Sequence, residues 1–216
     1  MSVKCGGTAL FMAFVLAGCA LGRDEIKLAN APLAAKSQLP SKGRTVFIRT
    51  VTDERVFAKN DNDTSLPSIE KDGDKAEVRA RAVSRKRIGY GMALGDVTLA
   101  SGQTVAGQVT DTLRQALQQS GYTVVTQAGA ANPIIVDVRV KKFWTWHKVG
   151  LAAITVSSDI HTELTILGAK SAPTALTVHV EDDKLVGGAD ATVESLEKAL
   201  AAYRAEAVAK LAGMTS

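Results

Sequence analysis

A thirteen-residue run in the last third of the chain has the clearest alternating pattern in the sequence. Between positions 154 and 166 the even positions are mostly aliphatic, and the odd positions are all polar or charged. Because successive side chains of a strand point to opposite faces of a sheet, the run predicts a strand with one buried face. Its other face is expected to meet solvent or a partner. Such a strand requires a sheet that is covered on one side only.

The segments around this strand predict the rest of the fold. Four further stretches read as strands, at positions 45–51, 122–126, 134–141 and 176–180. Helical spacing of apolar residues predicts a helix that follows Gly102 and ends at Gly121, and a second that runs from Asp190 or Thr192 to Leu211. Strands joined by short turns pair antiparallel, and two helices with one apolar face each cover one side of a sheet. We therefore expect a two-layer α+β domain, with a mainly antiparallel or mixed sheet of about five strands and both helices on one face.

The composition excludes several classes of protein. The chain has 216 residues, of which 46% are hydrophobic and 22% charged, which is typical of an ordinary globular domain. Its formal charge of +4 is too small to indicate a nucleic-acid partner. Two cysteines cannot build a disulfide framework or a four-cysteine metal site.

The first eighteen residues are typical of a secretory signal peptide. Lys4 is followed by thirteen uncharged residues from Gly6 to Gly18. This run is too short to cross a bilayer, since a spanning helix needs about 20 apolar residues, but it has the length of the apolar part of a signal peptide. No second long apolar run follows in the sequence, so we expect no transmembrane segment in the mature chain.

The signal ends in the sequence Leu16-Ala17-Gly18-Cys19, which resembles the lipobox of bacterial lipoproteins. The resemblance implies cleavage between Gly18 and Cys19, a diacylglycerol on the Cys19 sulfur, and a further acyl chain, such as palmitate, on the new amino group. Two or more acyl chains hold a protein stably on a membrane. Ala20 follows where enteric-type lipoproteins kept in the inner membrane have Asp. The resemblance therefore implies an outer-membrane protein that faces the periplasm.

We divide the chain into three parts. Residues 1–18 are the signal peptide, and residues 19–42, which are Ala-rich and polar without a sustained period, are expected to form a lipidated tether. Residues 43–213 are expected to form the single α+β domain. Within it, the stretch of about 58–82 is rich in Asn, Asp, Lys and Glu and predicts a flexible surface insertion.

A second resemblance concerns the folded part. The segment from Arg85 to Asp96, which reads RKRIGYGMALGD, and the predicted helix that follows it are similar to the YajG-type family of small outer-membrane lipoproteins. The end of the first strand, Thr52-Asp53-Glu54-Arg55, is similar too. Members include lipoproteins labelled as flagellar or cell-envelope proteins, and the layout is similar to auxiliary lipoproteins of envelope transport systems.

The sequence carries no motif that indicates catalysis. It has no Gly-Xaa-Ser-Xaa-Gly elbow, no Walker loop and no His-Glu-Xaa-Xaa-His zinc helix, and the glycines around position 90 lack dinucleotide-loop spacing. We expect no enzyme, no cofactor and no small-molecule substrate. The alternative in this class is a hydrolase with an unrecognised site near His147 or His179.

Two histidines are predicted on the outward face of the sheet. If the last hairpin turns near Ser171, His161 lies opposite Glu181, and Glu163 lies opposite His179. Such residues form either a solvent-facing charge ladder or a metal site of two histidines and two carboxylates. We favour the ladder, because no further ligand is clustered nearby.

Three patches are candidates for binding a partner. The first is the outward sheet face around Asp159, His161 and Glu163. The second is a basic cluster with Tyr90 close by, and its five cations are Arg79, Arg81, Arg85, Lys86 and Arg87. It is either a solvated loop or a site for anionic lipid headgroups, lipopolysaccharide phosphates or an acidic partner.

The third patch contains both tryptophans. Trp144 and Trp146 share parity with the core-facing Val140, so they are predicted to cap the core, and they would anchor a partner if they were exposed. Together these features predict a non-catalytic lipoprotein, attached to the membrane through Cys19, that binds another envelope protein and no nucleic acid. The alternatives are an auxiliary lipoprotein of lipid or polysaccharide transport and a flagellum-associated lipoprotein.

Overall fold

The computed structural model describes residues 22–29, 40–58, 63–70, 75–87, 92–127, 129, 132–169 and 172–212. The signal peptide, Cys19 and Tyr90 lie outside these residues. The described part forms an eight-stranded mixed sheet and three helices. The strands are β1 (Asp24–Ile26), β2 (Thr45–Asp53), β3 (Ala82–Arg87), β4 (Ala93–Leu99), β5 (Thr123–Val125), β6 (Ile134–Val149), β7 (Ile154–Ile166) and β8 (Thr174–Lys184). The helices are α1 (Ala76–Arg81), α2 (Val105–Gln119) and α3 (Ala189–Leu211).

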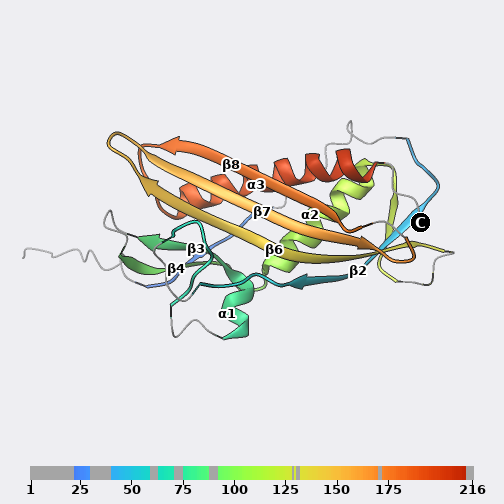
Figure 1. Ribbon diagram of the computed structural model, residues 1–216, viewed down its shortest axis with the longest axis horizontal. Coiled ribbons are helices and arrows are strands. Elements are labelled where there is room, and N and C mark those ends of the chain that lie inside the picture. Colours follow the sequence, from blue (N-terminus) through green and yellow to red (C-terminus); the bar gives the residue numbers. More distant parts are fainter. Residues whose placement is uncertain are drawn as a thin grey trace, which may run out of the picture.

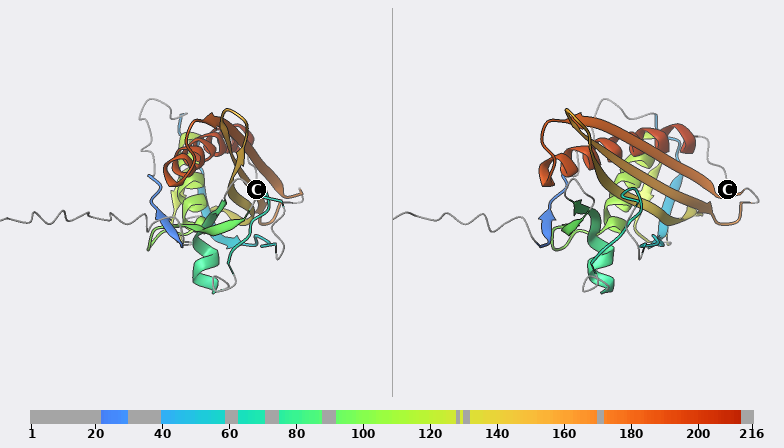
Figure 2. Two further views of the ribbon diagram at one scale, coloured as in Figure 1. Left: turned by 90° about the vertical axis from the view of Figure 1, so that its left-hand side faces the viewer. Right: turned by 60° about the vertical axis from the view of Figure 1, so that its left-hand side comes forward.

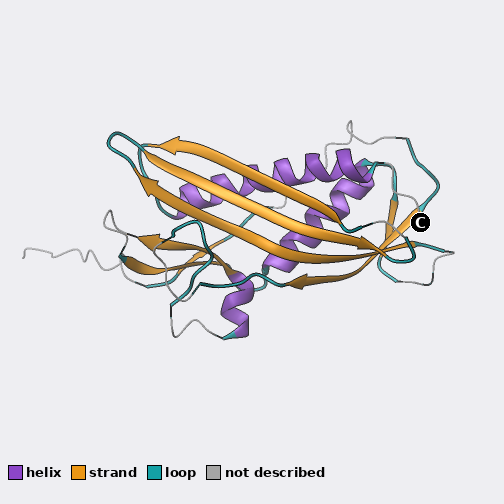
Figure 3. Cartoon of the chain, in the orientation of Figure 1, coloured by secondary structure: helices purple, strands orange, loops and turns teal. Residues whose placement is uncertain are grey.

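Three long antiparallel strands, β6, β7 and β8, form the main layer, and α2 and α3 lie side by side against one face of it (Figures 1 and 3). The core lies between these two layers. Its largest fully buried members on the helices and on the long strands include Leu113, Leu117, Leu196, Tyr203, Leu211, Phe143, Ile160, Leu164 and Leu176. The predicted α+β class is confirmed.

The sheet is larger than the sequence predicts, with eight strands in place of about five. β2 pairs in parallel with β6 and with β5, while β3 pairs antiparallel with β4, and β4 pairs in parallel with β1. β6 is long enough to have two neighbours along one edge. It pairs with β2 over Ile134–Val140 and with β3 at Thr145. The strands missing from the sequence prediction are β1, β3 and β4.

β1 lies in the segment that the sequence predicts to be a tether. Ile26 and Leu28 are almost completely buried in the core, and β1 pairs with β4 over its whole length. The Gly22 N–H also donates to the carbonyl of Leu94 at 3.0 Å. The two apolar side chains stabilise this segment by burial. Residues 22–29 therefore belong to the folded body, and the prediction of a tether over 19–42 is wrong for them.

The predicted flexible insertion over 58–82 is also partly wrong. Its last part forms α1, and Pro67 and Ser68 are buried. The described residues 63–70 lie over the outer side of β6, where the carbonyl of Thr64 accepts a hydrogen bond from the indole N–H of Trp144 at 3.2 Å. The large indole ring of Trp144 lies on the outer side of the sheet, and this polar segment covers it.

A β-bulge in β6 explains the position of that ring. The pairing of β6 with β7 shifts between Val140 and Lys142. Because one extra residue reverses the alternation of side chains, the even positions face the core before the bulge and face outward after it. The prediction that Trp144 and Trp146 share the core-facing side of Val140 is therefore wrong.

A buried arginine fills the gap between β2 and β3 along the edge of β6. The Arg55 side chain is inaccessible to solvent, and its Nη1 donates to the carbonyls of Ala82 at 2.6 Å and Phe143 at 3.1 Å. Nη2 donates to the carbonyl of Arg79 at 2.6 Å. These carbonyls lie where β2 has ended and β3 is just beginning, so Arg55 supplies the hydrogen bonds that a continuous strand would have made.

Candidate binding surface

The side of β6, β7 and β8 that faces away from α2 and α3 carries a band of polar and aromatic side chains, which we call the outer face. Figure 2 shows that the two long helices lie on the opposite side of these strands. The outer face consists of Lys142, Trp146, Ser157, Asp159, His161, Glu163, His179 and Glu181. It contains the first patch predicted from the sequence, and part of the third.

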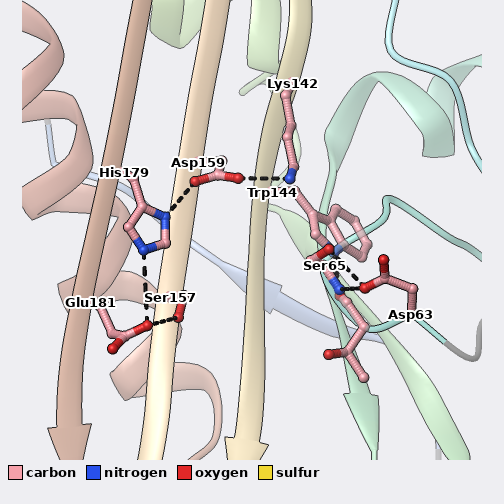
Figure 4. A network of polar contacts seen from close by, with 9 residues as sticks. Asp63, Ser65, Lys142, Trp144, Ser157, Asp159, His179 and Glu181 are labelled. Atoms are coloured by element: carbon pink, nitrogen blue, oxygen red, sulfur yellow. Dashed lines mark hydrogen bonds and ion pairs between the residues drawn. The ribbon is translucent and has the colours of Figure 1, made fainter.

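Asp159 is the centre of a polar network on this face (Figure 4). Its carboxylate accepts a hydrogen bond from Lys142 Nζ at 2.6 Å and contacts His179 Nδ1 at 2.7 Å. His179 Nε2 lies 3.8 Å from Glu181, which in turn accepts a hydrogen bond from Ser157 at 3.2 Å. An ammonium group, a carboxylate, an imidazole and a second carboxylate thus follow one another across three strands, and these contacts hold the side chains in a defined arrangement.

The register of the last hairpin differs from the prediction. Asp159 lies opposite His179, His161 opposite Thr177, and Glu163 opposite Ala175. The observed register displaces every predicted pair by four residues, and the chain leaves β7 at Gly168, whose φ of +82° suits a glycine. The predicted pairs of His161 with Glu181 and Glu163 with His179 are therefore wrong.

The corrected register also separates the ligands of the metal site that the sequence leaves open. Among the described residues, no group of three or more His, Cys, Asp or Glu side chains is placed to hold a metal ion. Glu163 instead forms an ion pair with Arg139 at 2.8 Å. The ladder interpretation describes the outer face better than the metal interpretation does.

The two tryptophans differ in their availability to a partner. Trp144 is 1% exposed, and the ring of Phe57 meets it edge-on, with the ring centroids 6.4 Å apart. Trp146 is only half-buried; its ring lies 5.8 Å from that of His179, and Lys142 Nζ is 5.0 Å from the ring centroid. Trp146 is therefore the aromatic side chain that this face presents, since a cation and a second ring already orient it.

The basic cluster is not a solvated loop. Arg85, Lys86 and Arg87 lie on β3, and each is half-buried. Lys86 forms an ion pair with Asp24 at 3.0 Å, and Arg87 donates to the hydroxyl of Ser68 at 3.3 Å. These cations tie β3 to β1 and to residues 63–70, so their first role is internal.

Arg85 contributes to the environment of a buried acid. Asp96 on β4 is inaccessible to solvent, and Arg85 and Arg23 approach it at 4.0 Å and 3.6 Å. Burial raises the pKa of Asp96, while the Glu70 N–H and the two arginines oppose that rise. An external anion would have to compete with this carboxylate, so the cluster is a weaker candidate for binding lipid phosphates than the sequence suggests.

A second surface, not recognised in the sequence, lies at the end of the sheet where β6 and β8 finish and β4 begins. Large exposed aliphatic side chains project there from three turns, and we call them the tip face; they are Met92, Val149, Leu151, Leu185 and Val186. A cavity of about 270 Å³ opens between the turns, lined in part by Leu94, Ile154 and Gly187. The signal in the sequence was the presence of aliphatic residues beside Gly150 and Gly187, where turns are usually polar.

His147 is one of the residues that line this cavity. Its Nε2 is 3.1 Å from the hydroxyl of Thr192 in the first turn of α3, and burial lowers its pKa. The hydroxyl of Thr192 donates to the carbonyl of Gly188 at 2.9 Å, so it is not held as a nucleophile with His147 as its base. The hydrolase alternative therefore gains no catalytic group here beyond the histidine itself.

Comparison with known proteins finds distant similarity only. No protein-family model matches the chain, and no curated protein sequence matches it. Among solved structures it is similar to an uncharacterised protein (14% identity, TM-score 0.45, covering 89% of this chain and 99% of the other). It is also similar to a DUF330-family protein from Xanthomonas campestris (10% identity, TM-score 0.45, covering 89% of this chain and 95% of the other). A third similar structure is a homologue of a neuraminyllactose-binding hemagglutinin from Helicobacter pylori (11% identity, TM-score 0.28, covering 84% of this chain and 89% of the other). Identities this low leave the function to be argued from the chain's own residues.

Proposed function

We propose that the chain is a non-catalytic bacterial lipoprotein, anchored through Cys19 in the outer membrane and facing the periplasm, whose outer face binds another envelope protein. The observation that carries the proposal is the sequence Leu16-Ala17-Gly18-Cys19 directly after a short apolar run. The resemblance of the Arg85–Asp96 segment to YajG-type lipoproteins supports the same assignment. Among the described residues, no helix has the length and hydropathy of a membrane span.

The outer face supports the binding role. It combines a half-buried tryptophan with exposed ionisable groups, since the His179 and Glu181 side chains are 53% and 60% accessible. Protein interfaces commonly place an aromatic anchor among charges that orient the partner. The Lys142–Asp159–His179 network holds these charges in place before a partner arrives, which lowers the entropy cost of binding.

Replacement of Cys19 by Ser tests the anchor. The variant should lose its lipid and move from the membrane fraction to the soluble periplasmic fraction. Cys5 provides the matched control, because it lies within the predicted signal peptide; Cys5→Ser should leave the protein in the membrane. A Cys19→Ser protein that stays membrane-bound at full yield would show that the anchor is assigned wrongly.

Photo-crosslinking in intact cells tests the binding face. A photoreactive amino acid at Trp146 or His179 should capture a specific envelope protein, whereas the same group at Glu206, on α3 behind the sheet, should not. Alanine at Asp159, His161 and Glu163 should then reduce the captured product. Equal capture from the two sides of the sheet would remove the case for the outer face.

One observation favours a second candidate function, that of an auxiliary lipoprotein for lipid or polysaccharide transport. The cavity beside the tip face has aliphatic side chains on part of its wall and basic side chains on another part; the aliphatic ones are Leu94, Val97, Val149 and Ile154, and the basic ones are Arg85, Lys86 and Arg87. The aliphatic part of such a cavity can shelter part of an acyl chain. Native mass spectrometry of the purified protein should then detect bound lipid, and Ile154→Trp, which fills the cavity, should abolish it.

A further inference from the structure

We propose that the tip face rests on the membrane, so that the long strands project away from the bilayer and present the outer face to the periplasm. The inference rests on the proposed anchor at Cys19. It goes beyond that anchor because it assigns a second membrane contact, with a lipid surface as the ligand, and a fixed orientation to the body.

The exposed aliphatic residues are concentrated at one end of the molecule. Five of the seven large hydrophobic side chains that are exposed in the described part of the chain belong to the tip face, and Leu151 is fully exposed. Scattered surface hydrophobic residues need no explanation, but a cluster at one end of a molecule marks an interaction site. The remaining two, Val56 and Leu66, lie elsewhere in the chain.

The pairing of the strands brings the three turns of the tip face together. Ile154 pairs with Lys184, which brings the turn with Leu185 and Val186 beside the turn between β6 and β7. The parallel pairing of Ser84 with Thr145 directs the end of β3 toward the same end of the sheet. One cavity is lined by residues next to all three turns, so the tip face is a single surface.

The predicted anchor at Cys19 is close in sequence to a residue that is held at the tip face. Gly22 is held to the body by the hydrogen bond from its N–H to the carbonyl of Leu94, two residues from Met92. Gly22 follows Cys19 by three positions, and even a fully extended chain covers at most about 11 Å over that distance. A lipid on Cys19 therefore draws this end of the body, and no other described part, to the bilayer surface.

These observations favour a bilayer over a protein as the partner of the tip face. The tip face consists of separate turns that protrude around a cavity, and each can insert its aliphatic side chains among the lipid headgroups without matching the shape of a partner. The acyl chains supply the affinity, and the inserted side chains set the orientation. The turn between β7 and β8 then stands about 40 Å further out, the length of β7.

Fluorescence quenching tests this orientation. The full chain is produced in cells, purified with its lipid, and reconstituted into vesicles of phosphatidylethanolamine and phosphatidylglycerol with or without brominated acyl chains. A fluorophore is placed at Leu151→Cys or, as the matched control, at Ala172→Cys in the exposed turn between β7 and β8. Bromolipid should quench most of the fluorescence at position 151 and leave position 172 unchanged.

Flotation of the same vesicles separates the two proposals. A protein that floats but shows no quenching at position 151, or equal quenching at both positions, overturns the tip-face contact and leaves the anchor intact. A protein that does not float overturns both. Leu185→Ser with Val186→Ser should lower the quenching at position 151 without changing flotation, because both side chains are exposed and contribute little to the fold.

Discussion

Asp53 accepts two parallel hydrogen bonds from Arg55, one from Nε to Oδ1 and one from Nη2 to Oδ2, each 2.8 Å long. The remaining donors of the guanidinium are directed at the carbonyls of Ala82, Phe143 and Arg79. One planar side chain thus joins the end of β2 to α1, β3 and β6. Each nitrogen of the Arg55 guanidinium thus has an acceptor, which a buried charge requires.

Arg55→Ala should destabilise the protein by about 3–5 kcal/mol, because Asp53 and three carbonyls lose their shared partner. Arg55→Lys should restore little of this, since an ammonium group cannot form the parallel pair and the three other hydrogen bonds together. Equilibrium unfolding in denaturant measures both. Arg49→Ala is the control: its ion pair with Asp137 is exposed to solvent, so its loss should change the stability far less. Full stability of Arg55→Lys would contradict the assigned role.

The elements with a clear period are the ones that the sequence predicts well. The strand at 154–166 and the helix from Val105 match their predicted positions, because each buries one face against its neighbours. In β6 the same reasoning fails after Val140. A bulge interrupts the alternation of side chains, and no residue pattern in the sequence indicates it. The alternation alone therefore places Trp144 and Trp146 on the wrong side of the sheet.

The other predictions that fail concern residues whose partners are distant in the sequence. The basic residues of β3 resemble a solvated loop because Asp24 and Asp96, which neutralise them, come from β1 and β4. The parallel pairing of β2 with β6 joins segments about 90 residues apart, and no local pattern encodes it. Of the candidate site, the charged character of the outer face could be predicted, but the pairing of Asp159 with His179 depended on where the hairpin turns.

Gly95→Ala should release β1 from the body. A Cβ at this position would lie 1.9 Å from the carbonyl oxygen of Gly22, so the backbone of one of the two must move. The amides of Glu25 and Ile26, which are paired with β4, should then exchange with solvent many times faster in hydrogen-exchange experiments. Gly129→Ala, where an added Cβ meets open space, should leave the same amides unchanged. Unaltered protection in Gly95→Ala would mean that β1 is not held at Gly22.

Tyr203→Phe should cost about 1 kcal/mol of stability, because the buried hydroxyl of Thr162 loses its partner at 2.8 Å. Burial raises the pKa of Tyr203, so the phenol stays neutral in the folded protein. The double variant Tyr203→Phe, Thr162→Val removes both partners and should be less destabilised than the sum of the single changes. Thermal unfolding of the four proteins measures the coupling, and additive effects would argue against the hydrogen bond.

Stability should fall as the pH drops below about 6.5, in part because of His147. Burial lowers its pKa in the folded state, so below that pH the unfolded chain binds a proton that the folded protein does not. The loss therefore begins at the unfolded pKa and is complete below the folded one. His147→Gln keeps a polar partner for Thr192 but cannot titrate, and its melting temperature should change less between pH 7 and pH 5 than that of the wild type. Equal pH dependence of the two proteins would exclude this contribution.

Metabolic labelling with radioactive palmitate is the most direct test of the central claim, that a lipid on Cys19 holds this body at the membrane. The wild-type chain should be isolated from the outer-membrane fraction with the label attached, and digestion should recover the label in the peptide that begins at Cys19. Cys19→Ser should carry no label. A mature wild-type protein without palmitate, or label attached anywhere else in the chain, would contradict the anchor and the membrane orientation that depends on it.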